Sequence, residues 1–288
     1  MTSVRVAAST LVAVALLAGC GGDDEATGPS LVSLSVSKNG STYELTAPAT
    51  VEAGLAEISL QVDTPATEEH EAQLIRVEGD HTLAEALEVL SSDEGGEPTP
   101  PWLFAGGGVG SIKGGTTATV TQMLEPGTYY VFDVGEGEGD NVPSFAEQGA
   151  TATIEVTGEA GDAELPGADA TVTAEDYSFT TERLVAGANR IRFNNTGEER
   201  HHVIAIPYEA GATFEDVKAF ATSDGPPDGP PPVDFSRALV TAVLEGGDSQ
   251  ITELNLASGT YALLCFISDR AGGPPHVAMG MIDEVVIE

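Results

Sequence analysis

An internal duplication constrains this chain more than any other feature of its sequence. His70 and His201 lie 131 residues apart in similar surroundings, each after an apolar run and a turn. Residues 124–133 match residues 256–265 at a step of 132. A repeat that persists at several landmarks indicates that one fold occurs twice, and the chain is long enough for two domains.

The pattern of short segments predicts an all-β protein. Short apolar runs alternate with turns, and the chain holds 34 glycines and 17 prolines. Such punctuation is typical of β-sandwiches. Each half also has one stretch with helical spacing, residues 82–90 and 213–220, which starts with a threonine suited to cap a helix. We therefore predict two tandem β-sandwiches, each with a short helical insertion.

The first twenty residues have the composition of an export signal. Arg5 precedes an apolar run over residues 6–17, which is shorter than the roughly 20 residues of a membrane-spanning helix. The run ends in Leu-Ala-Gly-Cys at residues 17–20, which resembles the bacterial lipoprotein signal. The resemblance implies cleavage before Cys20 and a diacylglycerol on its thiol. The mature protein would then be lipid-anchored to the cell membrane on its extracytoplasmic face.

Changes of composition divide the remaining chain. Residues 21–30 are mostly small and polar, which predicts a flexible tether. Residues 157–169 are rich in glycine, glutamate and alanine, which predicts a linker. The first domain is then expected at residues 31–156 and the second at residues 170–288.

The net charge limits the partners. Forty-six acidic residues against 11 basic ones give a formal charge of −35, with no basic cluster. Nucleic acid is therefore not expected as a partner. The acidic surface serves either solubility or the steering of a basic redox partner protein, and the composition leaves both open.

Cysteine usage leaves one thiol to explain. The chain has two cysteines, and if Cys20 carries a lipid then Cys265 has no disulfide partner. One interpretation is a buried core cysteine that acts as a small apolar residue. The other is a metal ligand or a reactive thiol, and cysteine counting alone does not choose between them.

A motif near the C-terminus favours the metal ligand. Residues 259–265 read Gly-Thr-Tyr-Ala-Leu-Leu-Cys, a loop follows, and then come His276 and Met281. This pattern resembles the signature of the cupredoxins, the plastocyanin-like blue-copper proteins, over about residues 168–288. The resemblance implies two tandem cupredoxin-like Greek-key sandwiches. It also implies one type 1 copper site with the ligands Cys265, His276, Met281 and His201, the last after a turn at residues 194–197.

The residue types suit copper. A copper ion that cycles between two oxidation states favours one thiolate, two imidazoles and a distant thioether. Residues adjacent on a strand face opposite sides, so only one of His201 and His202 can face the metal. The family alignment favours His201 and gives His202 the task of orienting the ligand loop, but the sequence does not decide between them.

The ligand loop and the first half both depart from the family. Ten residues separate Cys265 from His276, more than in plastocyanin-like members. We expect His276 at the exposed edge of the site, with residues 272–275 as a small apolar docking rim. The first half keeps His70 but has Asp133, Phe145 and Ala150 where the second has cysteine, histidine and methionine. We expect a metal-free first domain that serves as a spacer or docking surface.

These patterns favour an electron carrier. Copper storage or delivery is one alternative, and a metal-free structural or ligand-binding lipoprotein with a buried Cys265 is another. An enzyme is not expected, because the five histidines form no His-x-His pair of the kind multicopper oxidases need. The chain also has no Gly-x-Ser-x-Gly elbow.

Overall fold

The structure is a computed structural model that describes residues 28–91, 96–135, 142–223 and 229–288. The expected export signal with Cys20, and most of the expected tether, lie outside the described residues. Within the described ranges no helix is long and apolar enough to cross a membrane.

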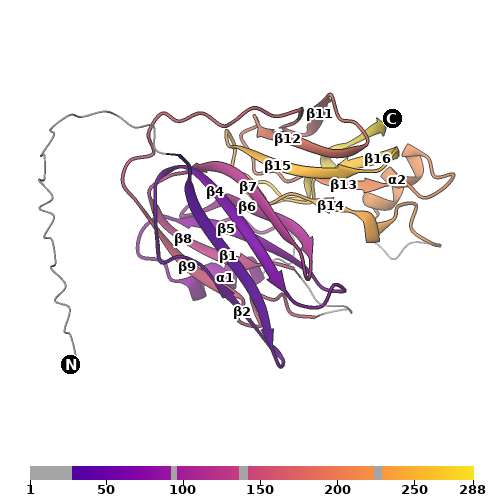
Figure 1. Cartoon of the computed structure of the whole chain (residues 1–288). Coiled ribbons are helices and arrows are strands. Elements are labelled where there is room, and N and C mark those ends of the chain that lie inside the picture. Colours follow the sequence, from indigo (N-terminus) through magenta and orange to yellow (C-terminus); the bar gives the residue numbers. More distant parts are fainter. Residues whose placement is uncertain (1–27, 92–95, 136–141, 224–228) are drawn as a thin grey trace, which may run out of the picture.

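The first half of the chain is a sandwich of two sheets with one helix outside (Figure 1). One layer has the strand order β2-β1-β4-β7 and the other has the order β3-β9-β8-β5-β6. The helix α1 packs against the second layer through a cluster that includes Ala86 and Phe132. The elements are β1 (Ser30–Asn39), β2 (Thr42–Thr46), β3 (Thr50–Glu52), β4 (Gly54–Asp63), β5 (Glu69–Val77), α1 (Leu83–Ser91), β6 (Leu103–Lys113), β7 (Thr117–Leu124), β8 (Gly127–Asp133) and β9 (Thr151–Thr157).

The second half repeats this plan. Its layers have the strand orders β11-β10-β12-β15 and β14-β13-β16-β17, and α2 packs on the latter through Val217 and Ile206. The elements are β10 (Ala170–Glu175), β11 (Ser178–Glu182), β12 (Gly187–Asn195), β13 (Ile204–Pro207), α2 (Phe214–Ala221), β14 (Leu239–Val240), β15 (Ser249–Leu256), β16 (Gly259–Leu264) and β17 (Ile282–Ile287), with two short 3-10 helices, η1 (Phe235–Arg237) and η2 (His276–Met279).

The strand pairings confirm the predicted tandem β-sandwiches. In each half the opening strand is antiparallel to the next strand and parallel to a later one: β1 to β4, and β10 to β12. In each half the strand that carries the Gly-Thr-Tyr sequence lies between the closing strand and a strand near the matching histidine, His70 or His201. The same set of strand pairings therefore occurs in both halves, which indicates two copies of one fold.

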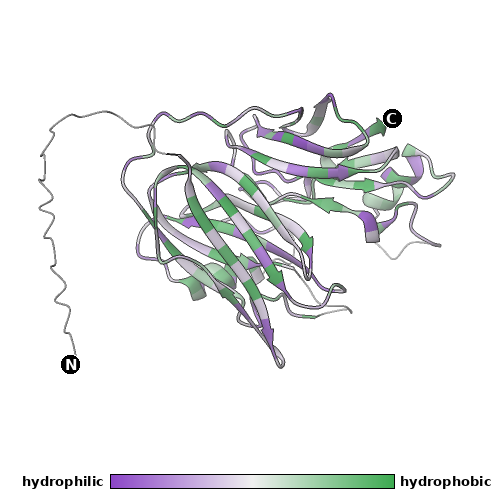
Figure 2. Ribbon diagram, in the orientation of Figure 1, coloured by the Kyte–Doolittle hydropathy of each residue, from purple (hydrophilic) through white to green (hydrophobic). Residues whose placement is uncertain are grey.

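Alternation of apolar and polar residues explains why these segments form half-buried strands. In β1, Val32, Leu34 and Val36 are buried while Ser33 and Ser35 are more exposed, and Figure 2 shows the same alternation along neighbouring strands. Successive side chains on a strand face opposite sides, so one face of each sheet is apolar. Each fully buried aliphatic side chain contributes about 1.5–3 kcal/mol.

Local hydrogen bonds repeat as well. The hydroxyl of Tyr129 accepts a hydrogen bond from the backbone N–H of Glu125, and Tyr261 accepts one from Ala257. Both helices begin as predicted, because Thr82 and Thr213 cap α1 and α2 in reciprocal hydrogen bonds with an acidic residue three positions on.

The two sandwiches share one sheet. β7 pairs antiparallel with β15, which joins four strands of each half into a continuous eight-stranded sheet. Gln250 Nε2 donates to Gln122 Oε1 and to Gly108 O across this join, both at 2.7 Å. Gln73 bonds both backbone groups of Val243. Buried polar groups that satisfy one another in this way fix how the halves lie together.

The closing strand β17 begins at Ile282, because its pairing with β16 extends to Leu264. One local detail differs from the sequence expectation, which placed His201 on a strand. His201 precedes β13 and joins the sheet through an isolated bridge with Leu244.

The close approach of the halves makes Gly110 sensitive to substitution. A methyl group there would lie 1.9 Å from the carbonyl oxygen of Val240, which is backbone of the second half. We expect Gly110→Ala to lower the free energy of unfolding by about 1–3 kcal/mol. Gly167→Ala, which meets no atom within 4 Å, should stay within about 0.5 kcal/mol of wild type. Urea unfolding measures both, and equal stabilities would contradict the described contact.

Candidate metal centre

One connection of the second sandwich carries three of the four predicted ligands. Cys265 follows β16 directly, His276 opens η2, and Met281 immediately precedes β17. The connection is closed at both ends, since β16 and β17 are antiparallel neighbours. His201 comes from the other side of β16, because it precedes β13, the second neighbour of that strand.

Backbone hydrogen bonds fix the spacing of these residues. The N–H of Val277 donates to Cys265 O at 2.8 Å, and the N–H of Met281 donates to His276 O at 2.9 Å. The N–H of His276 donates to Ile267 O at 2.9 Å. The ligand positions are therefore set by the protein backbone.

Three donor atoms converge between these elements. Cys265 Sγ lies 3.7 Å from His201 Nδ1 and 3.6 Å from His276 Nδ1, and the two nitrogens are 3.0 Å apart. Bonds of about 2.0 Å to nitrogen and about 2.3 Å to sulfur, as in zinc sites, place donors that share one ion about 3–4 Å apart. The three atoms thus have the separations of ligands around a single metal ion.

The outer ring nitrogens determine which atoms face inward. His201 Nε2 lies 2.8 Å from Asp176 Oδ1, and His276 Nε2 lies 3.0 Å from Asp269 Oδ1. A carboxylate only accepts, so each Nε2 carries the proton and each Nδ1 presents a lone pair. Two lone pairs 3.0 Å apart repel each other unless a cation or a proton lies between them.

Burial keeps the cluster neutral before a metal binds. It raises the pKa of the Cys265 thiol to about 11 and lowers the pKa values of His201 and His276. Burial alone would raise the pKa of Asp176, but hydrogen bonds from the backbone N–H of Glu198 and from His201 lower it. A bound cation would displace the thiol proton and leave a thiolate with two neutral imidazoles.

The fourth predicted ligand is also in the core. Met281 is fully buried in the same hydrophobic cluster as Cys265, whereas the second methionine of the loop, Met279, is 40% exposed. A thiolate, a thioether and two imidazoles are the soft and intermediate donors that copper favours. The arrangement is typical of a type 1 copper site.

The adjacent histidine has a different task. His202 is not part of the donor group, and its Nε2 accepts a hydrogen bond of 3.1 Å from the backbone N–H of Phe266. It therefore ties the strand segment of His201 to the residue that follows Cys265.

The first half contains the same turn without the ligands. Ala146 N donates to Asp133 O and Ala150 N donates to Phe145 O, which reproduces the backbone bonds of the second half. His70 Nδ1 lies 2.6 Å from Asp133 Oδ2, and the Phe145 ring stacks on His70 at 4.2 Å. An ion pair or hydrogen bond and an aromatic ring fill the space that the donor atoms occupy in the second half.

Both halves of the chain have the cupredoxin fold. The duplicated crossover, the matching turns and the histidine and cysteine donors of the second half together establish it.

Comparisons with known proteins gave matches among solved structures. No protein-family model and no curated protein matches the chain. A reduced auracyanin from the photosynthetic bacterium Roseiflexus castenholzii is 23% identical, with a TM-score of 0.27 over 41% of this chain and 94% of that one. A copper nitrite reductase from Nitrosomonas europaea is 16% identical, with a TM-score of 0.26 over 90% of this chain and 93% of that one. A blue copper oxidase from the same organism is 15% identical, with a TM-score of 0.23 over 89% of this chain and 85% of that one.

The expectation of an exposed His276 is wrong. The His276 side chain is 0% exposed. Its Nε2 is bonded to Asp269 of the long loop, and the loop glycines Gly272 and Gly273 lie against Gly96 of the first cupredoxin domain. The predicted docking rim is therefore partly covered by protein, because the extra loop length folds back towards the other domain.

Sequence reasoning missed the carboxylates that orient the ligands. Asp176 lies in the turn between β10 and β11, and Asp269 lies in the ligand loop, where it also accepts a hydrogen bond from Tyr177. Metal-binding histidines usually donate their second N–H to such a group. That rule predicts that the carboxylates exist, but nothing distinguishes these two among 46 acidic residues.

Loss of an orienting carboxylate should weaken metal binding. Asp269→Ala frees the ring of His276, so we expect the affinity for Cu(II) to fall by about 10–100-fold. Asp162→Ala removes an equal charge from an exposed position in the linker and should leave the affinity unchanged. Competition with a chelator measures both, and equal affinities would show that Asp269 does not orient the ligand.

Proposed function

We propose that this protein is an extracytoplasmic copper protein, anchored to the membrane by a lipid on Cys20, that carries single electrons. The observation behind the proposal is the convergence of one thiol sulfur and two Nδ1 atoms at Cys265, His201 and His276. Copper bound there would supply reversible one-electron chemistry between Cu(I) and Cu(II).

The protein residues supply rigidity. Backbone bonds fix the connection between Cys265 and Met281, and carboxylates hold both histidine rings in one orientation. Donor atoms that are held before the metal binds move little when its charge changes. A small rearrangement favours rapid electron exchange.

The burial of the site supports electron transfer over catalysis. The side chains of His201, Cys265, His276 and Met281 are all 0% exposed. Catalytic metal sites keep an open position for a substrate or water, and a ligand set closed on all sides by protein does not provide one. Electrons can cross the remaining protein layer, whereas substrates cannot.

Exposed apolar side chains next to the ligands support a docking function. Phe266, which is covalently linked to Cys265, is 44% exposed, and Met279, two residues before Met281, is 40% exposed. The charge of −35 favours a basic redox partner, because opposite charge accelerates encounter.

A copper titration tests the electron carrier directly. We expect the soluble chain without residues 1–20 to bind one copper and to develop an intense visible charge-transfer band. His276→Ala should remove the band, whereas His81→Ala, whose ring stacks on Trp102 in the first domain, should retain it. The measurements are an absorption spectrum and metal analysis.

The other outcomes separate the alternatives. One bound copper without a visible band or a reversible potential would indicate storage or delivery. No bound metal would leave a structural or ligand-binding lipoprotein. Two copper ions per chain would contradict the metal-free first domain.

The lipid anchor has its own test. Expressed in a bacterium, the full chain should incorporate a labelled fatty acid and sediment with membranes. Cys20→Ser should abolish both, because serine has no thiol to alkylate. Sedimentation of this variant at wild-type levels, without label, would rule out the lipid as the anchor.

A further inference from the structure

The long ligand loop between Cys265 and His276 lies against the first domain. The N–H of Thr99 donates to Arg270 O at 2.9 Å, and the N–H of Gly273 donates to Gly96 O at 3.0 Å. The backbones approach so closely that a Cβ at Gly272 would lie 2.3 Å from Gly96 O. The contact is therefore backbone on backbone and leaves no space for a side chain.

Arg270 continues this contact with its side chain. Its Nη1 lies 2.9 Å from Glu245 Oε1, and its Nη2 donates to Leu103 O at 2.9 Å. The guanidinium lies over the Phe104 ring at 4.9 Å. Glu245 in turn accepts a hydrogen bond from the N–H of Ala105. A residue of the ligand loop thus inserts into the start of β6 in the first domain.

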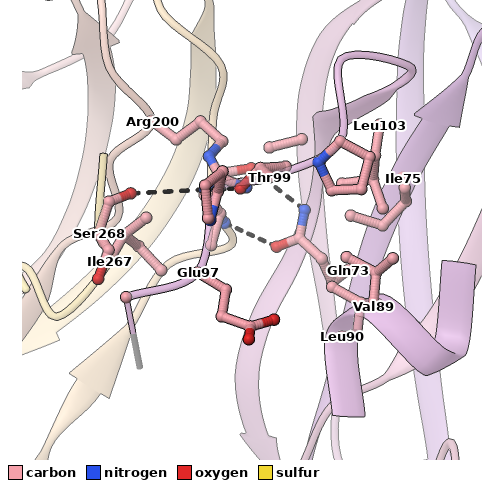
Figure 3. Close-up of a pocket in the computed structure, with 15 residues that line it drawn as sticks. Gln73, Ile75, Val89, Leu90, Glu97, Thr99, Leu103, Arg200, Ile267 and Ser268 are labelled. Atoms are coloured by element: carbon pink, nitrogen blue, oxygen red, sulfur yellow. Dashed lines mark hydrogen bonds between the residues drawn. The ribbon is translucent and has the colours of Figure 1, made fainter. Parts of the chain in front are cut away.

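A second arginine makes a similar contact beside the other ligand. Arg200 precedes His201, and its Nη2 donates to Thr99 Oγ1 at 2.6 Å. Figure 3 shows Arg200 and Thr99 between the domains, at a cavity of about 240 Å³ whose wall includes Ile267 and Ser268 of the ligand loop. Arg200, which precedes His201, and Arg270 of the ligand loop, which leads to His276, therefore both contact Thr99 of the first domain.

The contact continues to the donor atoms. Arg270 directly follows Asp269, and its backbone N–H donates to Glu199 Oε2 at 2.7 Å. Asp269 accepts from His276 Nε2. A loop held at Arg270 therefore holds the carboxylate that orients the inward nitrogen of His276.

We propose that the first domain is a scaffold for the copper centre, and that Arg270 is the positioning residue through which it acts. The inference rests on the proposed function. It gives the metal-free domain a task other than spacing, and it explains the ten-residue loop: the added length carries Arg270 into the neighbouring domain. Without this contact the loop would move, and the His276 ring with it.

Arg270→Met in the full-length chain tests this role. Arg76→Met is the matched control, because Arg76 also lies over the Phe104 ring, at 4.6 Å, but pairs with Glu78 and makes no described contact to the ligand loop. We expect Arg270→Met to lower the electron self-exchange rate of the copper-loaded protein by about 10-fold and to alter its charge-transfer band. Arg76→Met should change neither.

The metal-free protein gives an independent readout. The Nε2 proton of His276 is buried against Asp269, and its exchange with solvent can be followed by NMR. We expect Arg270→Met to accelerate that exchange at least about 10-fold. Arg270→Lys keeps the charge but cannot bond Glu245 and Leu103 at the same time through a guanidinium, so we expect an intermediate effect.

The outcomes distinguish this inference from the proposed function. Unchanged exchange in Arg270→Met and Arg270→Lys would overturn the positioning role, even if the protein binds copper. Accelerated exchange in a protein that fails to bind copper would support the scaffold and refute the electron carrier. Equal acceleration of the exchange in Arg270→Met and Arg76→Met would also overturn the positioning role, because Arg270 would then contribute only to the general stability of the protein.

Discussion

Two imidazole nitrogens 3.0 Å apart, with a thiol sulfur within 3.7 Å of each, are the constraint on which the rest of this structure depends. The two imidazole lone pairs repel each other at this distance, and the single proton of the thiol can be donated to only one of them. Only a stiff framework can hold them together without an ion. The sandwich supplies that framework through three neighbouring strands, two carboxylates and one hydrogen-bonded connection. The chemistry of the site follows from that rigidity more than from any single ligand.

The duplicated domain shows how the same framework behaves when its chemistry changes. The backbone turn is retained in the first half, with its hydrogen bonds from Ala146 and Ala150. The side chains now satisfy one another: Asp133 pairs with His70, and Phe145 stacks on the ring. Buried polar groups must be paired, and here the pair takes the place of a metal. The domain has kept its fold and gained a contact surface for the ligand loop.

Much of the fold and the candidate ligand residues of the centre can be predicted from the sequence. Apolar alternation predicts the strands, the threonine caps predict both helices, and the spacing of Cys265, His276 and Met281 within one connection is a local pattern. Local structures of this kind can be recognised from the sequence, because hydrogen bonds between residues close together in the chain determine them. The tandem arrangement was visible because the step of the repeat is nearly constant.

The remaining features depend on contacts between residues far apart in the chain. Asp176 reaches His201 from a different turn, and no periodicity marks it. The glutamine network that joins the domains uses polar residues in a core, which hydrophobic patterns cannot indicate. The sequence analysis places His276 at the exposed edge of the site, whereas its burial comes from the Asp269 carboxylate and the fold of the long loop.

Anomalous diffraction at the copper absorption edge, from crystals of the copper-loaded protein, tests the central claim most directly. The account predicts one strong peak per chain, bonded to Cys265 Sγ and to the Nδ1 atoms of His201 and His276, with Met281 nearby. A peak at His70, or a metal bound through the Nε2 atom of either ligand histidine, would contradict it.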